Sequence, residues 1–237
     1  MQLLRLFPKS TLAFAVTASL LVSAPAKAEG PMNTDDAGTL DKGGMKVEGV
    51  WSKDDKVKGT ELLFGFSPIE NLEVEVAVAR ARDDGASPAT RFDGVGFGAK
   101  WVPYQNELGW SLGSRFDFGR IRVTDHETPA RHTERAYALA GLASYRLGNG
   151  QVLHLNLGAA RVKAQGERDT LGIWGVGYEF PLAADLQLTL ETFGTQHARP
   201  EKAVGLRYQI FDGIKVSAAA GRGNNHSFGQ LGLAWEF

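Results

Sequence analysis

Hydrophobic and polar residues alternate along most of the chain after residue 42. In residues 72–78 (LEVEVAV) the Leu and Val side chains fall on one face and the Glu and Ala side chains on the other, and residues 153–157 (LHLNL) repeat the pattern. Successive side chains of a β-strand point to opposite faces, so this period of two predicts strands with one apolar and one polar face. No helical pattern of comparable strength is present in the sequence, which therefore predicts an all-β fold.

About 12 strands are expected when the chain is divided by the template of roughly ten residues that is typical of transmembrane barrel strands. Tight turns, such as residues 148–150 and 211–213, alternate with longer polar connections, such as residues 83–91 and 124–132. This asymmetry indicates a transmembrane antiparallel up-and-down β-barrel with its turns and both chain ends on the periplasmic side. The expected strands cover residues 43–53, 56–66, 71–82, 92–102, 109–123, 133–147, 151–163, 169–180, 185–196, 202–211, 214–222 and 227–237.

The chain ends on an aromatic residue that closes a strand-like segment. Leu231, Leu233, Trp235 and Phe237 share one face of residues 230–237. This end resembles the C-terminal strand of bacterial outer-membrane β-barrels, in which the terminal aromatic residue is part of the assembly signal. The resemblance implies that the outer-membrane assembly machinery recognises Phe237 and that outer-membrane lipid surrounds the barrel. A soluble β-sandwich would show the same alternation, but the two chain ends and the loop asymmetry favour the barrel.

The N-terminus has the three parts of a secretory signal. Arg5 and Lys9 are basic, residues 11–22 are mainly apolar, and residues 26–28 (AKA) fit the small-x-small cleavage pattern. The apolar stretch is about a dozen residues, short of the roughly 20 that a membrane anchor needs. We therefore expect residues 1–28 to be a Sec-type signal peptide and the mature protein to reside in the outer membrane of a Gram-negative cell.

Composition and charge narrow the function classes. The chain has no cysteine, which excludes disulfides and thiolate metal sites, and it has 29 glycines, which suit a tightly curved sheet. Removing residues 1–28 would take away three basic residues and no acidic ones, so the net charge would go from −1 to −4. This balance argues against nucleic acid as a main partner.

The polar face of the strands is expected to line the lumen, because charges facing lipid would cost about 2–4 kcal/mol each at the bilayer midplane. The resulting lining carries both signs. It could form a narrow pathway for small solutes, or its acids and bases could pair across the lumen and close it, and the sequence leaves both possibilities open. The expected lining residues are Glu48, Glu61, Glu73, Glu75, Lys100, Arg115, Asp117, Arg146, His154, Glu179, Glu191, Arg207 and Lys215.

Residues 29–42 do not alternate. Their TDDAGTL string (residues 34–40), followed by Gly43, resembles the start of a group of Gram-negative outer-membrane barrels and is similar to the family linked to meta-pathway phenol degradation. The resemblance implies transport of small compounds, aromatic ones among them, and no catalytic residues. The segment could plug the lumen, lie at the periplasmic mouth or be a disordered leader. The expected organisation is a signal peptide (1–28), a periplasmic N-terminal segment (29–42) and a barrel (43–237).

Catalytic and metal-binding patterns are weak. The sequence has no Gly-x-Ser-x-Gly, His-Glu-x-x-His or phosphate-binding loop, and His154 is the only histidine expected inside a strand. Histidines of the longer loops could bind a divalent metal such as Zn or Cu, but no fixed ligand spacing links them. We therefore expect no cofactor and no resident metal. The loop histidines are His126, His132, His197 and His226.

The favoured function is a non-enzymatic channel that takes up small solutes, aromatic or otherwise hydrophobic ones among them, through a narrow lumen of mixed charge. The first alternative is a closed structural or surface barrel whose loops bind a ligand, a metal or a partner. The second alternative is a lipid-modifying enzyme, which requires a Ser, Asp or Glu within hydrogen-bond reach of His154 in an accessible cleft.

Overall fold

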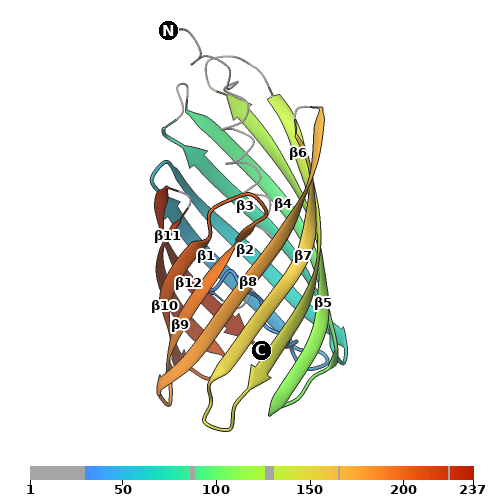
Figure 1. Cartoon of the computed structure of the whole chain (residues 1–237), viewed down its shortest axis with the longest axis vertical. Coiled ribbons are helices and arrows are strands. Elements are labelled where there is room, and N and C mark those ends of the chain that lie inside the picture. Colours follow the sequence, from blue (N-terminus) through green and yellow to red (C-terminus); the bar gives the residue numbers. More distant parts are fainter. Residues whose placement is uncertain (1–29, 86–88, 126–130, 165, 224) are drawn as a thin grey trace.

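Twelve antiparallel strands close into one barrel, as the slanted ribbons of Figure 1 show. The computed structural model describes residues 30–85, 89–125, 131–164, 166–223 and 225–237; the expected signal peptide lies outside these ranges. Each strand pairs with its neighbours in sequence, and the first and last strands pair with each other. Within the described ranges, no helix is long and apolar enough to cross a membrane.

The twelve expected strands are all present, with ends that differ from the expected ones by at most three residues. The all-β barrel prediction is therefore confirmed. The strands are β1 (Met45–Asp54), β2 (Val57–Ile69), β3 (Leu72–Asp83), β4 (Thr90–Tyr104), β5 (Gly109–Asp125), β6 (Arg131–Arg146), β7 (Val152–Ala164), β8 (Glu167–Ala183), β9 (Leu186–Thr195), β10 (Glu201–Phe211), β11 (Ile214–Gly223) and β12 (His226–Glu236).

Several strands are longer than expected because they continue through prolines. We expected turns to begin at Pro103 and Pro181, but β4 and β8 include these residues. The pairing register shifts between Trp101 and Tyr104 in β4, and next to Pro181 in β8. Proline has no N–H to donate to the ladder, so a strand can contain it only where the pairing is irregular.

The two ends of the barrel differ mainly in how far individual strands continue, and less in the length of the connections between strands. We call the end that carries Met45 and Glu236 the proximal end, and the opposite end the distal end. Strands β5, β6 and β8 are 16 or 17 residues long. At the distal end, the first residues of β8 continue past the end of β9, where Ile173 pairs with Thr195 (Figure 1). The longer connection expected at 164–168 is shorter than expected, because β7 continues to Ala164, which pairs with Glu167 at the start of β8.

Large apolar side chains cover the outer face of the barrel. Leu157 is 74% exposed and Val78 is 55% exposed, although both sit in the middle of regular strands. Aromatic residues stand near the proximal ends of the strands, where Trp110 and Tyr145 make an edge contact with ring centroids 5.0 Å apart. An apolar band bordered by aromatic residues is the surface that a barrel presents to lipid.

The inner face has two layers. Its proximal half is charged, with Glu73, Lys100 and Arg115 all at most 3% exposed. Its distal half is mainly apolar on β4 to β7, where Glu134 is also buried, and the single polar face expected from the sequence did not anticipate this layer. The apolar layer, which we call the distal apolar cluster, consists of Phe92, Ile121, Val123, Ala136, Val162 and Ala164.

Candidate functional site: a lumen occupied by the N-terminal segment

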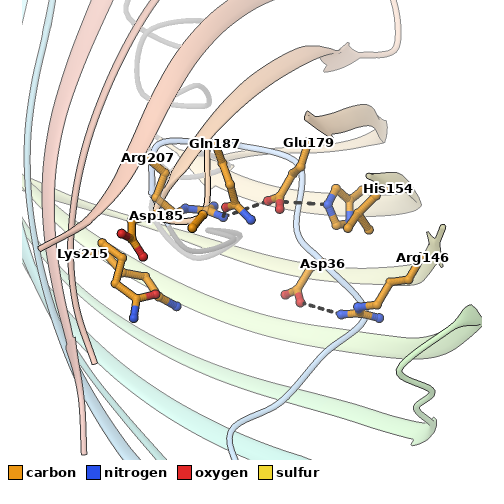
Figure 2. A pocket seen from close by; sticks show the side chains of 11 residues that line it. Asp36, Arg146, His154, Glu179, Asp185, Gln187, Arg207 and Lys215 are labelled. Carbon is orange, nitrogen blue, oxygen red and sulfur yellow. Dashed lines mark hydrogen bonds and ion pairs between the residues drawn. The ribbon is translucent and has the colours of Figure 1, made fainter. Parts of the chain in front are cut away.

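The N-terminal part of the described chain lies inside the barrel. Residues 30–44, which we call the inner segment, cross the proximal half of the lumen before the chain enters β1 (Figures 1 and 2). Met32, Thr34, Asp35 and Ala37 of this segment are at most 1% exposed. The inner segment makes no strand, so its backbone must find partners elsewhere.

Side chains of the wall supply those partners at two levels. The Glu191 carboxylate accepts hydrogen bonds from the Asn33 and Thr34 backbone N–H groups, with N to Oε2 distances of 2.8 and 2.9 Å. Further along, the Asp35 N–H donates to Asn156 Oδ1 at 2.6 Å, and Asn156 Nδ2 donates back to the Asp35 carbonyl at 2.8 Å. These bonds replace those that a sheet would provide to a buried backbone.

Ser144 makes the next contact. Its Oγ accepts a hydrogen bond from the Ala37 N–H at 2.7 Å and lies 2.8 Å from His154 Nδ1. A hydroxyl can accept one bond and donate another, so Ser144 connects the inner segment to the histidine behind it. Ala37 also packs against Val102 and Leu142 of the wall.

Two carboxylates of the inner segment bind wall cations. Lys100 Nζ lies 3.2 Å from Asp35 Oδ1 and 3.1 Å from Asp36 Oδ1. Arg115 Nη1 lies 3.1 Å from Asp35 Oδ2, and Arg146 Nη2 lies 3.5 Å from Asp36 Oδ2. Because the wall side chains Lys100 and Arg115 are almost completely buried, these bonds operate at low local dielectric, where losing one partner is costly.

The same cations continue into a network along the wall. Arg115 also binds Glu75 and, at 2.9 Å, Asp117. Lys46 Nζ lies 2.6 Å from Glu73 Oε1 and 2.7 Å from Glu75 Oε1. Acidic and basic side chains therefore alternate along the wall between β1 and β5. Asp35 and Asp36 of the inner segment complete this network on the side that faces the lumen.

Glycines of the wall make room for the inner segment. A Cβ atom added to Gly177 would lie 2.3 Å from Met32 Cε, and one added to Gly175 would lie 2.9 Å from Thr34 Oγ1. A Cβ added to Gly205 would lie 2.7 Å from Pro31 Cγ. The inward-facing glycines of β8 and β10 thus form a groove that only a wall without side chains can offer.

A second charged cluster stands beside the inner segment (Figure 2). Arg207 Nη1 donates to Glu179 Oε1 at 2.9 Å, and the Arg207 Nε donates to the Gly30 carbonyl at 3.1 Å. His154 Nε2 lies 3.7 Å from the same Glu179 oxygen. Ser144, His154 and Glu179 therefore form a hydroxyl–imidazole–carboxylate series. The alternative of a lipid-modifying enzyme requires such a series.

The series lacks the accessible cleft. Ser144 is 0% exposed, and its oxygen is held by the Ala37 N–H described above. The cavity beside the series is lined by His154 and Glu179, while Ser144 is not part of its lining. A substrate in that cavity would meet the imidazole and the carboxylate but not the hydroxyl.

Two cavities open at the proximal end, and Asp36 and Arg146 line both of them. The smaller has a volume of about 300 Å³ and is lined by His154, Glu179, Arg207 and other polar residues. The larger has a volume of about 790 Å³ and is lined mostly by residues 38–46 of the chain. The inner segment thus divides the proximal mouth into two compartments.

The structure brings most of the expected lining residues together around the inner segment. Arg146 and Lys215 are half-buried and line the smaller cavity, and Glu61 is half-buried on β2. Ser144 and Asn156, which were not expected as site residues, face the lumen with the same parity. The buried lining residues are Glu48, Glu73, Glu75, Lys100, Arg115, Asp117, His154, Glu179, Glu191 and Arg207.

The loop histidines are separate from this site. His132 Nε2 lies 2.8 Å from Glu134 Oε1 on β6, and His226 Nε2 lies 3.7 Å from Glu201 Oε2. His197 is exposed in the β9–β10 connection, and His126 lies outside the described residues. Across the described ranges, no group of three or more His, Asp or Glu side chains is placed to hold a metal ion.

Sequence comparison assigns the chain to a family. Residues 16–227 match the family model described as "Uncharacterised conserved protein UCP029691". The chain belongs to this family. The match does not confirm the finer resemblance to the family linked to phenol degradation. A comparison with curated proteins finds no match.

Solved structures of outer-membrane barrels resemble this one in fold. The COG4313 outer membrane channel from Pseudomonas putida F1 aligns with a TM-score of 0.64 at 12% identity, covering 85% of this chain and 98% of that one. The KdgM porin in complex with disordered oligogalacturonate aligns at 0.63 and 11%, covering 81% and 99%. The translocator domain of autotransporter NalP from Neisseria meningitidis aligns at 0.59 and 14%, covering 99% and 100%. At these identities the likeness shows the fold, a closed barrel of the kind found in outer-membrane proteins.

Proposed function

We propose that this protein is a non-enzymatic outer-membrane channel for small solutes whose lumen is closed by its own inner segment. The observation that carries the proposal is the way the inner segment is held. It crosses the proximal lumen, where hydrogen bonds and ion pairs to wall side chains hold it, and it is not a strand of the wall. The glycines of the wall leave the room that this occupant takes up.

The chemistry of the contacts suits an occupant that can leave. Buried ion pairs contribute little net stability, because the hydration that each charge loses nearly offsets the attraction gained. When the inner segment leaves, water can hydrate Lys100, Arg115 and the two aspartates. The seated and the released states therefore both satisfy their polar groups, which an apolar plug would not allow.

The two layers of the lumen suggest the kind of solute. A molecule that passed through the lumen from the distal end would cross the level of the distal apolar cluster, whose side chains are now at most 7% exposed, and then the charged half that contains Lys100 and Arg115. This sequence of surfaces favours small, partly apolar solutes that also carry a polar or charged group. Aromatic acids are one such class, which agrees with the resemblance of residues 34–40 to the phenol-linked family.

The placement in the cell belongs to the same proposal. We place the proximal end in the periplasm, with export directed by residues 1–28 and assembly directed by Phe237. The Phe237 backbone exchanges hydrogen bonds of 2.8 and 2.9 Å with Met45, so the residue that would direct assembly is also the residue that closes the barrel.

Single-channel recording tests the proposal. The refolded mature protein and a variant that lacks residues 30–42 are compared in planar bilayers, with heat-dependent gel mobility as the check that both are folded. We expect rare openings of the mature protein and frequent conductance steps of the truncated one. A folded truncated protein that gives neither conductance nor solute uptake in liposomes would overturn the channel proposal.

A further inference from the structure

A row of basic residues crosses the outer face of β5, β6, β7 and β8 near the distal end. Arg120 lies directly opposite Arg135, Arg135 opposite Lys163, and Lys163 opposite Arg168. Side chains that face each other across antiparallel strands have Cβ atoms only about 5 Å apart. Four cations therefore stand side by side on one surface, and we call them the β5–β8 basic row.

No carboxylate of the described chain neutralises this row. Within the described ranges, none of the four side chains takes part in an ion pair, and the one charge-related contact is Lys163 Nζ at 5.8 Å from the Tyr137 ring centroid. Arg120, Arg135 and Arg168 are exposed. Like charges directly opposite one another are destabilising, so the row is a surface that favours a bound anion.

The other side of the barrel provides a comparison. Lys53, Lys58, Arg82 and Arg91 form an equivalent row on β1 to β4, each opposite the next. Here a carboxylate accompanies the row: the Asp84 carboxyl binds Lys58 at 2.9 Å and also pairs with Arg82. The hydrogen bond from Lys58 lowers the pKa of the Asp84 carboxyl and keeps it ionised. Arg91 likewise lies 3.5 Å from an oxygen of Asp93.

The height of the β5–β8 basic row places it at the level of lipid headgroups. Phe118 and Tyr137, with ring centroids 5.1 Å apart, lie two residues closer to the middle of the barrel and form the distal edge of the apolar band. Trp110 and Tyr145 form its proximal edge. From Trp110 to Phe118 the strand rises about 27 Å at roughly 3.4 Å per residue. A strand tilt of roughly 40° reduces this rise to about 20 Å along the membrane normal. This value is close to the height of the apolar band of outer-membrane barrels.

We propose that the β5–β8 basic row binds the phosphate groups of an anionic lipid headgroup in the leaflet around the distal end, namely the phosphorylated glycolipid of the outer leaflet. The proposal rests on the outer-membrane placement proposed above and is independent of channel activity. Three of the four residues are arginines, whose planar guanidinium groups bind phosphate oxygens in pairs. A headgroup with more than one phosphate would contact neighbouring members of the row at the same time.

The test uses the full mature protein in a neutral detergent, with diphosphorylated lipid A and chemically dephosphorylated lipid A as probes. Binding is followed by native mass spectrometry, and folding by heat-dependent gel mobility. The test variant is Arg120→Gln with Arg135→Gln. The matched control is Lys58→Gln with Arg82→Gln, which removes the two cations that pair with Asp84 in the other row.

We expect the unmodified protein to prefer the phosphorylated probe by about tenfold or more, the test variant to lose about tenfold in affinity for it, and the control variant to stay within about twofold. Equal binding of both probes to the unmodified protein would overturn the proposal without any variant. Equal losses in the two variants would show only a nonspecific basic rim. Complete displacement of the probe by millimolar inorganic phosphate would assign the row to a soluble anion in place of a lipid.

Discussion

Asp35→Asn is the substitution that addresses the inner segment most directly. It removes the charge that Lys100 and Arg115 share, at 3.2 and 3.1 Å, and keeps the shape of the side chain. Losing one partner of a buried ion pair costs roughly 3–5 kcal/mol. Lys100 keeps Asp36 and Arg115 keeps Glu75, so we take the lower end of this range, about 3 kcal/mol.

This cost falls on the seated state alone, because water hydrates the same groups once the inner segment has left. At 1.4 kcal/mol per factor of ten, the ratio of open to closed channels should rise about 100-fold. Single-channel recording measures that ratio directly as the open fraction. The matched control is Asp41→Asn, which changes the same residue type in the same segment at an exposed position. An unchanged open fraction in a folded Asp35→Asn protein, or an equal rise in the Asp41→Asn control, would refute the reasoning.

Three further substitutions probe other contacts. Ser144→Ala leaves the Ala37 N–H without its acceptor, which costs about 1–3 kcal/mol, so the open fraction should rise about tenfold; no rise would mean that water replaces the hydroxyl. Gly177→Val fills the space of Met32 and should make the inner segment sensitive to protease from the proximal side, whereas protection equal to the unmodified protein would show that the segment has adapted. Leu157→Arg on the outer face should lower the free energy of unfolding in lipid vesicles by about 2–4 kcal/mol in urea titrations and leave conductance unchanged.

The strands could be predicted from the sequence because a barrel strand is defined by local information. A period of two over roughly ten residues fixes both the strand and the face that each side chain occupies. Strand β3 is the clearest case, since Leu72 to Val78 alternates without a break. The predicted strand ends at Pro103 and Pro181 were wrong, because a register shift allows a proline to stay in the ladder.

No single rule predicts from the sequence which face of a strand, the polar or the apolar one, points to the lumen. In residues 119–124 of β5 (GRIRVT) the arginines face outward and the Ile and Val face the lumen. The alternation is unbroken, but its sign is inverted relative to the membrane band below. A period of two reports that two faces differ and does not report which solvent each one meets, so the distal apolar cluster escaped the sequence analysis.

The path of the inner segment through the lumen could not be predicted from the local sequence pattern either. Residues 30–44 have no periodicity, and their partners are remote: Glu191 is 157 positions from Thr34, and Asn156 is 121 positions from Asp35. Only the folded barrel brings these groups together. The available signal was indirect, in glycines that recur on the inward face of β8 and in buried cations of the wall that need acidic partners.

The inner segment ends where β1 begins, and β1 is one side of the seam at which Met45 pairs with Phe237. A segment that leaves the lumen therefore stays attached to the rim of its own pore, as a tethered blocker. A short tether keeps such a blocker at a local concentration of about millimolar order, whatever the abundance of the protein. Closure is then intramolecular, and a solute that holds the channel open has to compete with a blocker that cannot diffuse away.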